Sequence, residues 1–188
     1  MYRHLSTLTL GSALAAALGL AAPLSVQAFH LPAPCDKITA SGTVITESGS
    51  TASFAVTGGC KNGKWWGSVS FADPASGIQI SSTEISGYAW DPAAPQGRDI
   101  CGLAVDANGD DVFFRVHLAD FGEPGKNDVF GIAIDNPETA GERFYTLMSE
   151  TLTDGNVQLH RANRSNRPDP AFAALQEWQM CGDLSSPQ

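Results

Sequence analysis

Short runs that alternate apolar and polar residues follow one another along the chain, from about residue 40 to residue 160. In residues 65–72, Trp65, Val69 and Phe71 fall on one face and Trp66 falls on the other. This period of two indicates half-buried β-strands. Turn residues recur every 8–12 positions with no helical pattern between them, which is typical of an antiparallel sandwich or barrel. The predicted strands are 42–47, 53–57, 65–72, 78–81, 84–90, 100–105, 112–119, 129–134, 144–148 and 156–160.

One segment near the C-terminus has a helical pattern. Asp169 precedes Pro170 as an N-cap before a first-turn proline, and Phe172, Leu175 and Trp178 follow at three-residue spacing. We therefore predict an all-β fold: a single antiparallel β-sandwich or barrel of about nine strands, with a short C-terminal helix.

The first 28 residues have the pattern of a signal peptide. Residues 8–24 are almost wholly Ala, Leu and Gly, and Val26 and Ala28 place small residues at the −3 and −1 positions of a cleavage site. A membrane anchor is the alternative, but Pro23 interrupts the apolar run and no basic flank follows it. We predict a secreted or periplasmic protein, residues 29–188, with no membrane attachment after cleavage.

The four cysteines all lie in this exported part, and none has C-x-x-C spacing. An even number in an oxidising compartment predicts two disulfides, for which three pairings are open. If residues 43–46 pair with 53–56 in a hairpin, Cys35 and Cys60 lie nearly opposite each other at its open end. We therefore favour the pairs Cys35–Cys60 and Cys101–Cys181.

Composition narrows the class of protein. The 188 residues are 43% hydrophobic and 16% charged, which fits one folded domain and excludes a disordered chain. The formal net charge of −9 argues against a nucleic-acid partner, because such proteins need a basic face.

Three acids gather in the loop DFGEPGKND at residues 120–128: Asp120, Glu123 and Asp128. Calcium takes several oxygen ligands at once, so this loop is the candidate metal site, and no cofactor other than calcium is expected. The alternative is a structural turn whose aspartates accept backbone N–H groups. Residues 106–111 begin like a calcium loop but lack the glycine and glutamate that an EF-hand requires.

The same loop carries a family resemblance. The loop 120–128, the strand VFGIAI that follows it, and GNVQLH at 155–160 are similar to a signature of bacterial secreted β-domains, as are the upstream segments 69–73 and 77–80. The chain thus resembles the post-COAP type domain family. This resemblance implies a compact β-fold and export, and it implies no activity or catalytic residues.

Four aromatic residues are candidates for ligand contact: Trp65, Trp66, Tyr88 and Trp90. Trp65 and Trp66 are adjacent on a strand, so they point to opposite faces, while Tyr88 and Trp90 share a face. The alternative is that these rings fill the core. Exposed, they would form a platform for sugar rings or for a protein partner.

No catalytic residue is assigned. The mature chain has no G-x-S-x-G motif, and its cysteines are expected to be paired. The leading hypothesis is an exported, non-enzymatic β-domain that binds an extracellular ligand or protein partner, with carbohydrate as the specific version. The alternatives are a small secreted hydrolase that uses acidic residues, and a structural domain stiffened by calcium.

Overall fold

The computed structural model describes residues 32, 34–136, 143–163, 167, 169–173, 175, 177–182, 184, 186 and 187. The predicted signal peptide lies outside them, as do the side chains of Phe172 and Trp178. None of the helices in the described part is long and apolar enough to cross a membrane.

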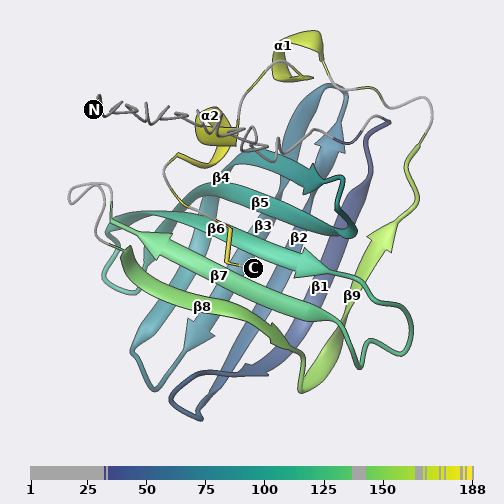
Figure 1. Ribbon diagram of the computed structural model, residues 1–188. Coiled ribbons are helices and arrows are strands. Elements are labelled where there is room, and N and C mark those ends of the chain that lie inside the picture. The colour runs from purple at the N-terminus through teal and green to yellow at the C-terminus, as the bar shows by residue number, and fades with distance from the viewer. Residues whose placement is uncertain are drawn as a thin grey trace, which may run out of the picture.

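Nine antiparallel strands form one curled sheet, a half-barrel, in the order β8-β7-β6-β5-β4-β3-β2-β1-β9 (Figure 1). This confirms the predicted all-β class. The strands are β1 (Lys37–Ile45), β2 (Thr51–Lys61), β3 (Lys64–Asp73), β4 (Ile78–Asp91), β5 (Ala94–Asp106), β6 (Asp111–Ala119), β7 (Val129–Asp135), β8 (Arg143–Thr151) and β9 (Asp154–His160).

The sequence and the structure differ in two elements. The predicted strands 78–81 and 84–90 are one strand, β4, which continues through a bulge between Ser82 and Glu84. The predicted helix consists of two short ones, α1 (Pro170–Ala173) and α2 (Glu177–Cys181). The cap is as predicted, because Asp169 Oδ1 accepts the Ala171 N–H at 2.9 Å.

The core lies where the sheet folds back on itself. The rings of Phe54 on β2 and Phe130 on β7 stack with centroids 4.0 Å apart, although β3 to β6 separate these strands in the sheet. Figure 1 shows β6–β8 crossing in front of β1–β3. The inward side chains of both halves therefore form one apolar interior, as the alternating pattern requires.

The C-terminal segment covers part of the outer face. Cys101 on β5 is bonded to Cys181, and Ser86 on β4 donates to the Met180 carbonyl at 2.7 Å. Further along, Ser149 on β8 donates to the Pro187 carbonyl at 2.6 Å. The outer face of β4 to β8 is thus partly covered, whereas no described segment covers the outer face of β1 to β3.

Candidate functional site

The two adjacent tryptophans lie on opposite faces of β3, as predicted. Trp65 packs against both apolar clusters of the protein. Trp66 is half-buried on the outer face, in a cross-strand row with Gly59 of β2 and Lys37 of β1. Trp66 also lines a hollow of the outer face.

That hollow has a volume of about 390 Å³ and lies at one end of β1 and β2. We call it the Trp66 hollow. It is lined by the Cys35–Cys60 disulfide together with Asp36, Lys37, Lys61, Asn62, Trp66, Arg161 and Asn163.

Backbone geometry explains how these residues come together. A Cβ added at Gly59 would lie 2.8 Å from both the Asp36 carbonyl oxygen and Lys37 Cβ, so only glycine fits between β1 and the end of β2. Lys37 on β1 pairs with His160 on β9, and this places the next residue, Arg161, at the same end of the sheet. Three segments distant in sequence, the start of β1, the β2–β3 hairpin and the residues after β9, therefore meet at one end of the sheet.

Small hydroxyl and methyl side chains continue from the Trp66 hollow along the outer face of β1 to β4. We call this surface the hydroxyl face. Within β1 to β4 its cross-strand rows carry no charge, whereas Thr43 also pairs with Asp154 on β9. A second hollow of about 240 Å³ lies within this face. Its residues are Thr39, Ser41, Thr43, Ser53, Ala55, Thr57, Ser68, Ser70, Ala72, Gln79 and Ser81.

Asp36 is the one carboxylate among the described residues that line the Trp66 hollow. Both of its oxygens bind other side chains of the protein. Its Oδ1 accepts the Tyr88 hydroxyl at 2.6 Å and Arg98 Nε at 3.2 Å, and its Oδ2 is paired with Arg98 Nη2. Burial and the nearby Asp36 charge raise the pKa of Tyr88 well above its usual value. The Asp36 charge is therefore offset by Arg98.

For Tyr88 the structure shows the alternative in which the ring fills the core, so Tyr88 and Trp90 do not form an exposed pair. Tyr88 has no exposed surface, because its ring joins the core and its hydroxyl binds Asp36. Trp90 is half-buried, and the Arg98 guanidinium lies 5.6 Å from its ring centroid. Both rings thus pack around the Asp36–Arg98 pair.

The acids of the 120–128 loop lie against β9. Asp128, fully buried, accepts Phe121 N–H at 2.8 Å and Val157 N–H at 2.7 Å. Asp120 accepts Gly122 N–H at 2.8 Å and Leu159 N–H at 2.7 Å. Both aspartates therefore bind backbone N–H groups on the free edge of β9. This is the structural role that is the alternative to a calcium site.

Glu123 accepts the Asn156 side-chain amide at 3.2 Å. In the described part of the chain, no three His, Cys, Asp or Glu side chains are grouped as a metal site would require. The calcium site stays a prediction.

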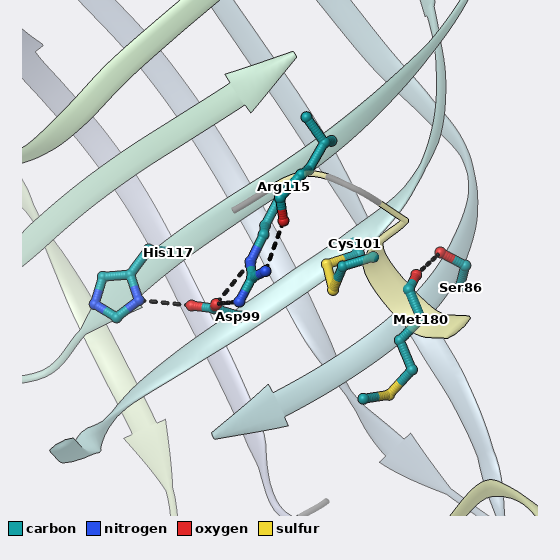
Figure 2. Close-up of a disulfide and its surroundings, with 8 residues drawn as sticks. Ser86, Asp99, Cys101, Arg115, His117 and Met180 are labelled. Atoms are coloured by element: carbon teal, nitrogen blue, oxygen red, sulfur yellow. Dashed lines mark hydrogen bonds and ion pairs between the residues drawn. A yellow bond between two sulfur atoms is a disulfide. The ribbon is translucent and has the colours of Figure 1, made fainter. Parts of the chain in front are cut away.

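A buried charged cluster under the C-terminal segment was missed from the sequence (Figure 2). Asp99 on β5 lies between Arg115 and His117 on β6, with Arg115 Nε at 2.8 Å and His117 Nδ1 at 2.6 Å. Arg115 also donates to the Leu184 carbonyl at 2.7 Å. The available signal was the position of Asp99 directly before the apolar run 100–105, and of Arg115 and His117 at alternate positions of the apolar run 112–119.

This cluster has a histidine and an aspartate in contact, as a hydrolase has. Burial alone would raise the pKa of Asp99, but the His117 hydrogen bond and the Arg115 charge lower it below its usual value. No hydroxyl or thiol of the described residues hydrogen-bonds to the other His117 ring nitrogen. The contacts give the cluster a structural role, because Arg115 anchors the C-terminal segment through the Leu184 carbonyl.

Neither a protein-family model, nor a curated protein, nor a solved structure matches this chain. The post-COAP resemblance stays a prediction. The structure does place its two main segments in contact, since the 120–128 loop binds residues 156–159 through the hydrogen bonds described above.

Proposed function

We propose that this protein is an exported, non-enzymatic β-domain that binds carbohydrate on the outer face of β1 to β4. The observation that carries the proposal is the Trp66 hollow, where an aromatic ring lies beside polar side chains at the end of the hydroxyl face. Its volume of about 390 Å³ falls within the range of ligand pockets.

The chemistry of the surface matches that of a sugar. The apolar face of a sugar ring packs on an aromatic ring, and its hydroxyl groups both donate and accept hydrogen bonds. Trp66 provides the ring, while Asn62, Asn163 and the hydroxyl face provide the polar contacts. From Lys37 to Thr43 the face extends roughly 20 Å at about 3.3 Å per residue, which gives room for a chain of sugars.

Binding fits the site better than hydrolysis. A glycosidase needs two carboxyl groups roughly 5–10 Å apart across the bond it cleaves. Among the described residues that line the hollow, Asp36 alone carries a carboxylate, and Arg98 and Tyr88 engage it. Export is part of the proposal too, supported by the two disulfides and the signal-peptide pattern.

The test is retention of the protein on immobilised polysaccharides, comparing wild type with Trp66→Ala. Loss of a central aromatic contact of about 2 kcal/mol would weaken binding roughly thirtyfold. Phe113→Ala is the matched control, because Phe113 is an exposed aromatic on β6, far along the sheet from the Trp66 hollow. Equal retention of wild type and Trp66→Ala on every polysaccharide that binds would overturn the proposal.

A further inference from the structure

We infer that the Trp66 hollow selects acidic carbohydrates, whose carboxylate or sulfate groups bind Lys37, Lys61 and Arg161. The inference rests on the proposed function and names the chemical class of its ligand. All three cations line the hollow beside Trp66.

The three cations come from separate parts of the chain. Lys37 begins β1, Lys61 ends β2 and Arg161 follows β9. These strands are neighbours in the order β2-β1-β9, and their register brings the three positions to the same end of the sheet. The gathering of positive charge is therefore a product of the fold and not of a basic run in the sequence.

The positive charge of the hollow is not cancelled by the protein. All three cations are exposed, and within the described part of the chain none forms an ion pair. Of the carboxylates nearby, Asp36 is paired with Arg98, and Asp169 packs on Gly63 of the β2–β3 turn, where its Oδ1 caps α1. The residues that line the hollow thus carry three positive charges and one carboxylate, Asp36, which Arg98 neutralises, on a chain of net charge −9.

The combination of an aromatic ring, polar side chains and three cations in the hollow favours an acidic glycan over a nucleic acid as the ligand. Either ligand, as a polyanion, would meet the repulsion of a chain of net charge −9 beyond this end of the sheet, so the preference rests on the groups beside Trp66. An acidic sugar needs a ring to stack on, polar groups for its hydroxyls and a few cations for its anionic groups, and these occur together beside Trp66. The neutral hydroxyl face next to the hollow then accommodates the adjoining sugars.

The experiment measures binding of the full exported protein to polygalacturonate, to chondroitin sulfate and to fully methyl-esterified polygalacturonate, which keeps the sugar backbone but removes its charge. The triple variant Lys37→Gln/Lys61→Gln/Arg161→Gln removes the three cations, and Lys126→Gln, on the exposed 120–128 loop, is the matched control. Each lost surface ion pair weakens binding a few-fold, so we expect a loss of about tenfold or more for the triple variant.

Support requires that wild type prefer an acidic polymer to the esterified one, that the triple variant lose this preference, and that Lys126→Gln keep it. Binding should also weaken as salt rises from 0.05 to 0.5 M, because screening acts on exposed charges. The comparison of polygalacturonate with chondroitin sulfate separates carboxylate from sulfate recognition.

Four outcomes overturn the inference. Equal binding of acidic and esterified polymers that Trp66→Ala still reduces would refute acidic selectivity and leave the proposed function standing. An unchanged preference in the triple variant would place recognition elsewhere. Binding of single-stranded DNA that exceeds binding of both acidic polymers and depends on the three cations would identify a nucleic-acid ligand instead. Absence of binding to any polysaccharide would refute the proposed function itself.

Discussion

At the scale of single residues, the buried charges act by pairing. Asp99 and Arg115 each have about 1% of their side-chain surface exposed, and His117 contacts the second oxygen of Asp99. Removal of one partner from such a pair leaves an uncompensated buried charge, which is costly. Asp73 is also buried, but hydrogen bonds stabilise it: it accepts the Tyr145 hydroxyl at 3.0 Å, a contact between β3 and β8.

Asp99→Asn should destabilise the protein by about 3 kcal/mol at pH 7, because Arg115 stays buried without a countercharge. The free energy of unfolding in urea measures this effect. Asp110→Asn, at an exposed turn, is the control and should change stability by less than about 0.5 kcal/mol. A loss as small as that of the control would show that the pair contributes little.

The same residue predicts a pH dependence. The pKa of Asp99 in the folded state lies below its usual 3.8, so its contribution to stability is present above pH 3.8. The contribution is lost as pH falls further, through the folded-state pKa. The stability difference between wild type and Asp99→Asn should therefore shrink below about pH 4. A constant difference from pH 7 to pH 2.5 in urea titrations would contradict this assignment.

At the scale of elements, the 120–128 loop completes the hydrogen bonding of an edge strand. One side of β9 pairs with β1, and the Val157 and Leu159 N–H groups of its other side are bound by Asp128 and Asp120. The loop thus covers an edge that would otherwise be open to another strand.

Asp128→Ala should lower the free energy of unfolding by about 3 kcal/mol, since two hydrogen bonds to a buried carboxylate are lost. Amide hydrogen exchange should quicken at Val157. Glu123→Ala, at an exposed position of the same loop, is the control.

The melting temperature of wild type should be the same in EDTA and in calcium, because the aspartate oxygens already accept N–H groups. A rise with calcium that Asp120→Ala and Asp128→Ala abolish would instead establish the predicted metal site.

At the scale of the whole molecule, the two disulfides have different structural roles. Cys35–Cys60 joins the start of β1 to the end of β2, across 25 positions of the chain, and lines the Trp66 hollow. Cys101–Cys181 spans 80 positions and fixes the C-terminal segment on β5. The second bridge therefore decides which half of the outer face is covered.

Replacing both cysteines of Cys101–Cys181 by serine should destabilise the protein by about 4.5 kcal/mol, against about 3.5 kcal/mol for Cys35–Cys60, since the longer loop gains more entropy when released. Urea unfolding of the two double variants checks the order. Carbohydrate retention should survive the loss of Cys101–Cys181, because that bridge is outside the hollow. The reverse order of stability would mean that native contacts, and not loop entropy, dominate.

Local pattern was enough to predict both disulfides, the N-cap at Asp169 and the strands other than β4, which it divided at the bulge between Ser82 and Glu84. Alternation with period two depends only on neighbouring residues, and the pairing of Cys35 with Cys60 follows from the register of one hairpin. With that pair assigned, Cys101 and Cys181 were left to form the second bond.

The site depended on contacts that no local pattern contains. Sequence alone predicted that Trp65 and Trp66 face opposite ways, but it could not show that Tyr88 turns into the core beneath Arg98. The meeting of Lys37, Lys61 and Arg161, and the burial of Asp99 beneath the C-terminal segment, follow from strand order and curl. The sequence by itself determined the β-strands and their faces, because each strand buries its own apolar side. Only the tertiary structure decided which outer face stays open and which distant charges share it, because that depends on how the sheet curls and where the C-terminal segment is fixed.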